Sequence, residues 1–146
     1  MKPGKDCIGV SVFALVFNSR NEFLLIRTRP SEKKSKEYNN IWSMPGGTIE
    51  FGETVNDALV REIFEETGLK IQDIKFLCYN DFIRPDEGKH WVSLNFKAFS
   101  TDDHFTSNDT TEIKECSWFN FKNVPENISQ FTKKCLEIVR KESKEL

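Results

Sequence analysis

Residues 45–69 read PGGTIEFGETVNDALVREIFEETGL, and this stretch decides how the rest of the chain is interpreted. The sequence predicts a helix that begins at Thr54 and runs to about Thr67. Thr54 suits an N-terminal cap, and Asp57 follows three residues later, in a pattern similar to a capping box. Gly68 supplies the stop that glycine often provides at a helix C-terminus. The apolar residues that we expect to pack against a sheet are Leu59, Val60, Ile63 and Phe64.

Three glutamates of this helix, Glu62, Glu65 and Glu66, are spaced i, i+3 and i+4, so their carboxylates share one face. Crowded like charges raise the free energy unless something neutralises them. A divalent cation does so and gains hard oxygen ligands, which favours Mg²⁺, with Mn²⁺ as a substitute. The alternative is a solvated acidic face, and for an isolated E-x-x-E-E that would be the better interpretation.

The surrounding residues fit a ligand site as well. Arg61 precedes Glu65 by four residues and can orient a carboxylate from the side. Glu53 lies just ahead of the helix, where negative charge is favoured, and can reach Arg61. Gly46 and Gly47 let backbone approach a ligand closely, and one of their carbonyls could join a metal shell.

The complete string resembles the Nudix box at every position that this motif specifies. The motif is a glycine, five residues, a glutamate, seven residues, Arg-Glu, an aliphatic residue, any residue, Glu-Glu, any residue, a glycine and an aliphatic residue. The matching positions are Gly47, Glu53, Arg61, Glu62, Ile63, Glu65, Glu66, Gly68 and Leu69. A nine-position match is highly specific, so it favours a functional site over a solvated face.

The resemblance implies both a fold and a chemistry. The implied fold is α/β (α+β), a mixed β-sheet sandwiched between α-helices, and the 146-residue length suits a single domain over residues 1–146. The implied reaction is Mg²⁺-dependent hydrolysis of a nucleoside diphosphate linked to another group. Glu65 and Glu66 are alternatives for the general base. The implied site residues are the metal ligands Gly46, Glu62, Glu65 and Glu66 and the orienting residues Glu53 and Arg61.

Within this superfamily the chain looks most like the MutT-type nucleoside triphosphate pyrophosphatases, which release a nucleoside monophosphate and pyrophosphate. The resemblance rests on residues 45–53, 90–92 and 112–118. One alternative is a pyrophosphatase of ADP-ribose or a nucleotide sugar. The other is a non-catalytic nucleotide-binding module, which the intact carboxylate set disfavours.

A further metal ligand is implied outside the box. In MutT-type enzymes a glutamate in the loop before the late tryptophan-bearing strand contributes to the site. In this chain the matching residue is Glu112, with Glu115 and Asp109 as rivals. A solvated loop carboxylate is the plain alternative, because polar residues normally occupy loops.

Substrate contacts are harder to read from sequence. Arg27 lies in a predicted strand, and its guanidinium suits phosphate oxygens, although a solvated strand edge is the default. Trp42, His90 and Trp91 are candidates to stack on or hydrogen-bond a base, with core packing as the alternative for the tryptophans. Gly47 is a candidate for close backbone approach.

The flanking sequence predicts more strands than helices. The expected strands cover residues 7–18, 22–29, 41–44, 70–81, 90–100 and about 116–119, and the segment 82–84 can extend the fourth. Residues 130–142 have apolar positions at helical spacing and predict a closing amphipathic helix. Residues 30–40 and 101–111 read as polar loops.

Composition excludes several classes of protein. A net charge of −2 gives no global basic field, so we expect no stable nucleic-acid binding. The apolar stretches are too short to span a bilayer, and no signal-peptide pattern follows the first residues. The four cysteines form no C-x-x-C pair, which predicts reduced and mostly buried thiols in a cytoplasmic protein. The expected partner is a small nucleotide, and a homodimer is left open.

Overall fold

The computed structural model describes residues 1–28, 40–106 and 113–145. A seven-stranded sheet runs through the middle of the molecule, in the order β3-β2-β1-β6-β5, with β4 also paired to β1 and β7 to β2. The strands are β1 (Gly9–Phe17), β2 (Phe23–Thr28), β3 (Trp42–Ser43), β4 (Gly46–Thr48), β5 (Gln72–Arg84), β6 (Lys89–Phe99) and β7 (Ile113–Phe119). β1 and β6 are parallel while the other strand pairs named here are antiparallel, so the sheet is mixed as expected.

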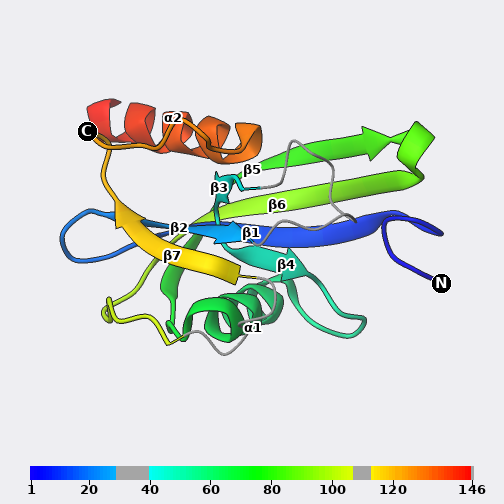
Figure 1. Cartoon of the computed structure of the whole chain (residues 1–146). Helices are drawn as coiled ribbons and strands as arrows, with labels where there is room; N and C mark the ends of the chain where they lie inside the picture. The colour runs from blue at the N-terminus through cyan, green and yellow to red at the C-terminus, as the bar shows by residue number, and fades with distance from the viewer. Residues whose placement is uncertain (29–39, 107–112, 146) are drawn as a thin grey trace.

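One helix covers each face of the sheet, as Figure 1 shows: α1 (Val55–Thr67) below it and α2 (Gln130–Glu145) above it. Alternation along β1 divides its side chains between the two sides. Val12 and Val16 join the core under α1, whereas Leu15 and Phe17 join the core under α2. The expected sandwich is therefore confirmed. No helix in the described residues has the length and apolar character needed to cross a membrane.

The two ends of α1 follow from their sequence. The Thr54 hydroxyl accepts a hydrogen bond from the Asp57 N–H at 3.1 Å, which caps the first turn. At the other end Gly68 takes a left-handed conformation with φ 76°, and its N–H donates to Phe64 O at 2.8 Å. A Cβ on Gly68 would lie 1.9 Å from Thr106 Oγ1, so the segment that follows β6 packs tightly against this end of α1.

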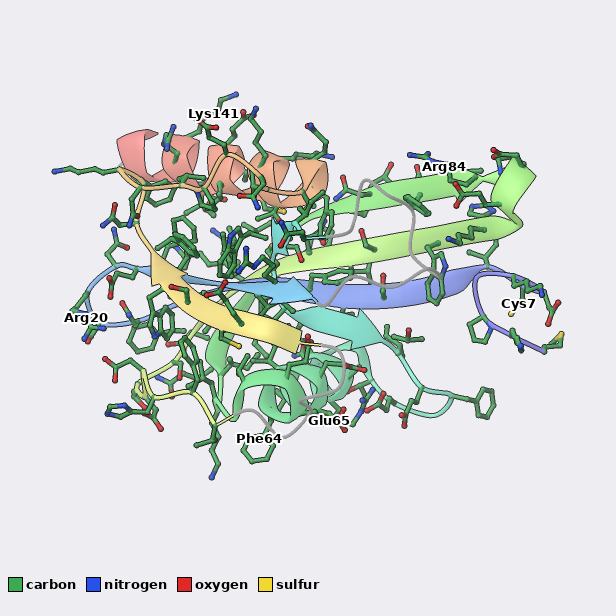
Figure 2. All side chains as sticks on the ribbon, viewed as in Figure 1. Cys7, Arg20, Phe64, Glu65, Arg84 and Lys141 are labelled. Atoms are coloured by element: carbon green, nitrogen blue, oxygen red, sulfur yellow. The ribbon has the colours of Figure 1, made fainter. Side chains whose placement is uncertain are left out.

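The apolar face of α1 differs from the expected one. Leu59 and Ile63 are fully buried as predicted, but Val60 and Phe64 are 39% and 42% exposed. Phe64 points away from the sheet (Figure 2). Val60 directly follows buried Leu59, and Phe64 directly follows buried Ile63. Successive helical residues are rotated by about 100° around the helix axis, so these two side chains do not face the sheet. That stripe is Ala58, Leu59, Ile63 and Thr67.

The predicted strands are present with small shifts at their ends, the expected extension of the fourth strand through residues 82–84 is confirmed, and one strand was missed. β5 extends to Arg84 with register shifts against β6, and a 3₁₀ turn, Pro85–Glu87, then leads into β6. Gly46–Thr48 forms β4, although its glycines gave no strand signal. All four cysteines are free, but the expectation that most are buried is wrong: Cys135 is buried, Cys7 is exposed and the other two are half-buried.

Candidate active site

Arg61, in the middle of α1, is the centre of a cluster of carboxylates. Its Nε and Nη2 donate to the two oxygens of Glu53 at 2.7 and 2.8 Å, a two-pronged contact that fixes the guanidinium plane. Nη1 donates to Glu62 Oε1 at 3.0 Å and to Glu65 Oε2 at 3.3 Å. Nη2 also donates to the Thr48 carbonyl at 3.1 Å, which ties the helix to β4. The expected contact between Glu53 and Arg61 is therefore present.

The two glycines of β4 lie against the glutamates of α1. A Cβ on Gly47 would lie 2.4 Å from the Glu62 carboxyl carbon, so a side chain there would collide with the carboxylate. Gly46 N–H donates to Glu66 Oε1 at 2.8 Å. A Cβ on Gly46 would meet Val12 O at 2.0 Å, because β1 runs directly alongside. Both glycines are thus needed for the close approach of β4 to β1 and to α1, while the expected approach to a ligand stays a prediction.

The cluster shifts the titration of its members in opposite directions. Hydrogen bonds from Arg61, and then from the Glu50 N–H, lower the pKa of Glu53 to about 2. Burial raises the pKa of Glu62 above its ordinary value, against the lowering effect of its hydrogen bond with Arg61. The Glu53 hydrogen bond raises the pKa of Arg61, which stays charged. An additional positive charge nearby would therefore stabilise the ionised form of Glu62.

The donor set suits a hard divalent cation. Carboxylate oxygens from Glu62, Glu65 and Glu66 occupy one side of α1, and such oxygens are the ligands that Mg²⁺ and Mn²⁺ prefer. Within the described residues, no three acidic, histidine or cysteine side chains converge on one point as they stand. Glu62 and Glu65 turn toward Arg61, while Glu66 turns toward Gly46. Glu65 is 54% exposed, so it has room to change rotamer and join the others.

Arg27 and Trp42, two predicted substrate contacts, lie together on the opposite side of the sheet. The Arg27 guanidinium lies 5.2 Å from the centre of the Trp42 ring and forms an ion pair with Glu115. Trp42 is only 8% exposed and packs edge-on against Phe119. Core packing thus accounts for Trp42, while Arg27 keeps a buried Nε without a partner in the described part of the chain.

His90 and Trp91 are adjacent on β6, so their side chains leave opposite faces of the sheet. Trp91 pairs with Gly9 and covers the N-terminal turn, where a Cβ on Gly4 would lie 2.1 Å from its ring. The His90 N–H donates to Gly4 O at 2.8 Å. Both residues are therefore engaged with the N-terminal segment, and the structure does not bring them together with Arg61. Glu112 lies outside the described residues.

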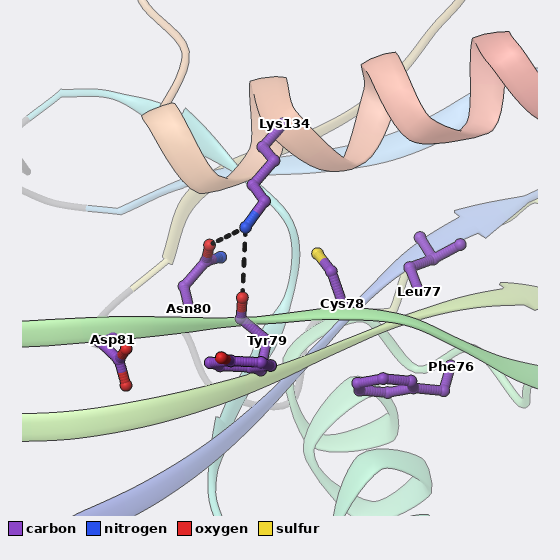
Figure 3. Close-up of a pocket in the computed structure, with 7 residues that line it drawn as sticks. All are labelled: Phe76, Leu77, Cys78, Tyr79, Asn80, Asp81 and Lys134. Carbon is purple, nitrogen blue, oxygen red and sulfur yellow. Dashed lines mark hydrogen bonds between the residues drawn. The ribbon is translucent and has the colours of Figure 1, made fainter.

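The sequence interpretation missed a polar group on the α2 side of the sheet. Asn95 is fully buried on β6, level with Phe13 of β1, and its Oδ1 has no hydrogen-bond partner among the described residues. Its Nδ2 lies 3.7 Å from the Cys78 sulfur. The only available signal was an asparagine between apolar residues of a strand. An open pocket next to it is lined by Cys78, Asn80 and Lys134 among others (Figure 3).

Comparison with known proteins agrees with this geometry. A family model described as the NUDIX domain matches residues 8–137. The chain is 34% identical over 112 residues to an ADP-ribose pyrophosphatase of Methanocaldococcus jannaschii, covering 75% of this chain and 61% of that protein. It is 31% identical over 114 residues to the 8-oxo-dGDP phosphatase NUDT18 of Danio rerio, covering 77% and 32%.

A solved structure shows the same architecture over almost the whole chain. The crystal structure of a MutT NUDIX hydrolase from Burkholderia pseudomallei superimposes with a TM-score of 0.76 and 27% identity, covering 90% of this chain and 97% of that one. The chain therefore spans nearly all of this neighbour, but less than two thirds of the two curated relatives.

Proposed function

Because the chain belongs to the NUDIX domain family, we propose that it hydrolyses the diphosphate linkage of a nucleoside diphosphate joined to another group. The observation that carries this proposal is the cluster around Arg61. Glu62, Glu65 and Glu66 present carboxylates beside the glycines of β4, where a Cβ would block the approach. Such a cluster is costly for stability alone, and it suits a metal-bound diphosphate.

The residues of the cluster divide into ligands and positioning residues. Glu62, Glu65 and Glu66 would hold Mg²⁺ or Mn²⁺ with the Gly46 carbonyl, and the ion would supply charge stabilisation at the phosphoryl oxygens. Glu53 and Arg61 hold the glutamates in place from the side. Glu65 is the more exposed of the glutamates bonded to Arg61, so it can rotate to accept a proton from an attacking water. Glu66 is the rival for this role.

The nucleoside would lie on the α2 side of the sheet. β1 pairs with β4 through Ser11–Phe13 but with β2 at Phe17, so the sheet forks beside Gly46. The nucleoside would pass this point to reach the α2 side of the sheet. There Asn95 offers a buried acceptor, and Arg27 offers a buried donor. A base edge and a phosphate oxygen, respectively, fit these two groups.

The comparisons favour a diphosphate compound over the nucleoside triphosphates that MutT resemblance suggests. The Methanocaldococcus jannaschii relative is named for ADP-ribose, and the Danio rerio relative for 8-oxo-dGDP. ADP-ribose is therefore the first substrate to test, and nucleoside triphosphates are the second. A non-catalytic binding module would need neither the intact glutamates nor a fixed Arg61.

A substrate panel tests this function. We expect ADP-ribose, nucleotide sugars, 8-oxo-dGDP or nucleoside triphosphates to be cleaved at a phosphoanhydride bond with added Mg²⁺, with products separated by ion-exchange chromatography. Adding a metal chelator should abolish the product. Binding of a nucleotide without cleavage at any Mg²⁺ or Mn²⁺ concentration would instead support the binding module.

A further inference from the structure

Two cysteines meet where α2 crosses β5. Cys78 Sγ on β5 lies 3.6 Å from Cys135 Sγ on α2, although the two residues are 57 positions apart in sequence. The contact has no part in the cluster around Arg61. As reduced thiols the pair makes only a weak S–H contact, which contributes little to stability. Sulfur atoms at this separation need only a small movement to form a covalent bond.

The two thiols differ in access. Cys78 lines the open pocket beside α2, next to Asn80 and Lys134, as Figure 3 shows. Lys134 Nζ donates to Tyr79 O and Asn80 Oδ1 at 3.3 and 3.1 Å, so the ammonium is held at the mouth of this pocket. Cys135 is fully buried behind Cys78. A small reagent can therefore reach Cys78 and not Cys135.

The buried thiol of Cys135 is suited to react only after Cys78 has been modified. Burial, and then the neighbouring Cys78, raises the pKa of Cys135, so it remains a protonated thiol near neutral pH. It does not compete for a reagent in solution. Once Cys78 carries a leaving group, the Cys135 sulfur lies in contact with the sulfur it must attack.

We propose that Cys78 and Cys135 form a redox-modification site, in which Cys78 reacts first with a small-molecule disulfide and Cys135 then closes an intramolecular disulfide. This inference is independent of the proposed function. In the first step the Cys78 thiolate attacks one sulfur of glutathione disulfide, breaks that S–S bond and releases one glutathione thiolate. In the second step the Cys135 sulfur attacks Cys78 Sγ and passes its proton to the departing glutathione sulfur, so the second glutathione leaves as a thiol.

Glutathione disulfide is the only oxidant that the two steps require. Two protein thiols are oxidised to one disulfide, and one glutathione disulfide is reduced to two thiols. Closing the bond shortens the sulfur separation from 3.6 Å to about 2.0 Å. Asn95 Nδ2 contacts the Cys78 sulfur, so movement of that sulfur on disulfide formation changes the surroundings of the buried Asn95 amide.

Peptide mapping tests the proposal directly. A Cys7→Ser/Cys116→Ser variant retains only the two contacting cysteines, and tryptic cleavage places them in separate peptides, residues 76–89 and 135–140, because trypsin does not cut before Pro85. We expect glutathione disulfide to join these peptides in the folded protein, with loss of two hydrogens, and dithiothreitol to separate them. Unjoined peptides from folded protein, while the urea-unfolded protein reacts readily, would overturn the proposal.

Single variants in the same background test the order of the steps. With Cys135→Ala, Cys78 should retain glutathione as a lasting mixed disulfide, because no second thiol displaces it. With Cys78→Ala, Cys135 should remain unmodified in folded protein over the same time. Rapid glutathionylation of Cys135 in that variant, with its melting temperature preserved, would contradict Cys78 as the entry point.

Discussion

Arg61 shows how one residue can organise a site without being its chemical agent. Two nitrogens of its guanidinium group, Nε and Nη2, donate to the two oxygens of Glu53. The third, Nη1, donates to Glu62 and Glu65. A lysine could not make these contacts together, because an ammonium is a point donor without a planar fork. The spacing in the sequence was sufficient to predict the Glu53–Arg61 contact, since seven residues and one helix start fix their relative positions.

The pairing of Glu53 with Arg61 predicts a pH effect on stability. The pKa of Glu53 falls from 4.5 to about 2 on folding. Its contribution is therefore complete above pH 4.5 and is lost as the pH falls through about 2. We expect the free energy of unfolding, measured with urea, to decline more between pH 4.5 and 2 in wild type than in Glu53→Gln. Parallel pH curves would contradict the predicted pairing.

The surroundings of the predicted substrate contacts were harder to predict than those of the glutamates. Trp42 and Trp91 carry the same sequence signal as aromatic residues that bind bases, yet one packs in the core and the other on Gly4. Asn95 carried almost no signal, because its unpaired oxygen becomes visible only when β6 pairs with β1. Burial depends on which strands meet, and local sequence does not specify that.

At the scale of elements, α1 was predictable and β4 was not. Thr54 and Gly68 mark the ends of the helix by local hydrogen bonds that depend on neighbouring residues alone. β4 consists of Gly46, Gly47 and Thr48, a composition that disfavours a strand. β4 pairs with β1 despite this composition, and its glycines are required because β1 leaves no room for a side chain at Gly46 and the Glu62 carboxylate leaves none at Gly47.

The C-terminal end of α1 gives a stability prediction. Gly68→Ala places a Cβ at φ 76° and 1.9 Å from Thr106 Oγ1, so it should lower the free energy of unfolding by about 2 kcal/mol. Thr54→Ala removes only one cap and should cost about 1 kcal/mol. Urea unfolding measures both, with exposed Asn56→Ala as the control. An equal or smaller loss for Gly68→Ala would show that the end of the helix relaxes freely.

At the scale of the whole molecule, the sheet keeps the carboxylates and the pocket on opposite faces. α1 lies on one side of the sheet and α2 on the other (Figure 1). The glutamates belong to α1, whereas the two contacting thiols pack in the core under α2, beside Asn95. Beside Gly46 the partner of β1 changes from β4 to β2, and we propose that the nucleoside passes between the two sides at this point. The expected sandwich could be predicted from the order of strands and helices, whereas the fork could not, because it depends on β1 having different partners along its length.

Metal binding should stabilise the whole fold. A cation that binds only the folded carboxylate cluster adds about 2.7 kcal/mol at a hundredfold excess over its dissociation constant. We expect the melting temperature to rise with millimolar Mg²⁺ or Mn²⁺ in wild type and less in Glu62→Gln, since Glu62 has the buried carboxylate with a raised pKa. Calorimetry at constant ionic strength measures the shift. An identical shift in both proteins would mean that the ion binds elsewhere.

The central claim is that the glutamates of α1 carry a metal-dependent hydrolysis. The most direct measurement is turnover of the best substrate of the panel against Mg²⁺ concentration, in Glu65→Gln and Glu66→Gln. The control is Glu137→Gln, which removes an exposed carboxylate of α2. We predict that at least one α1 variant loses about a hundredfold or more in turnover at saturating Mg²⁺ while its melting temperature is retained, and that the control matches wild type. Near-wild-type turnover in both α1 variants would contradict the account.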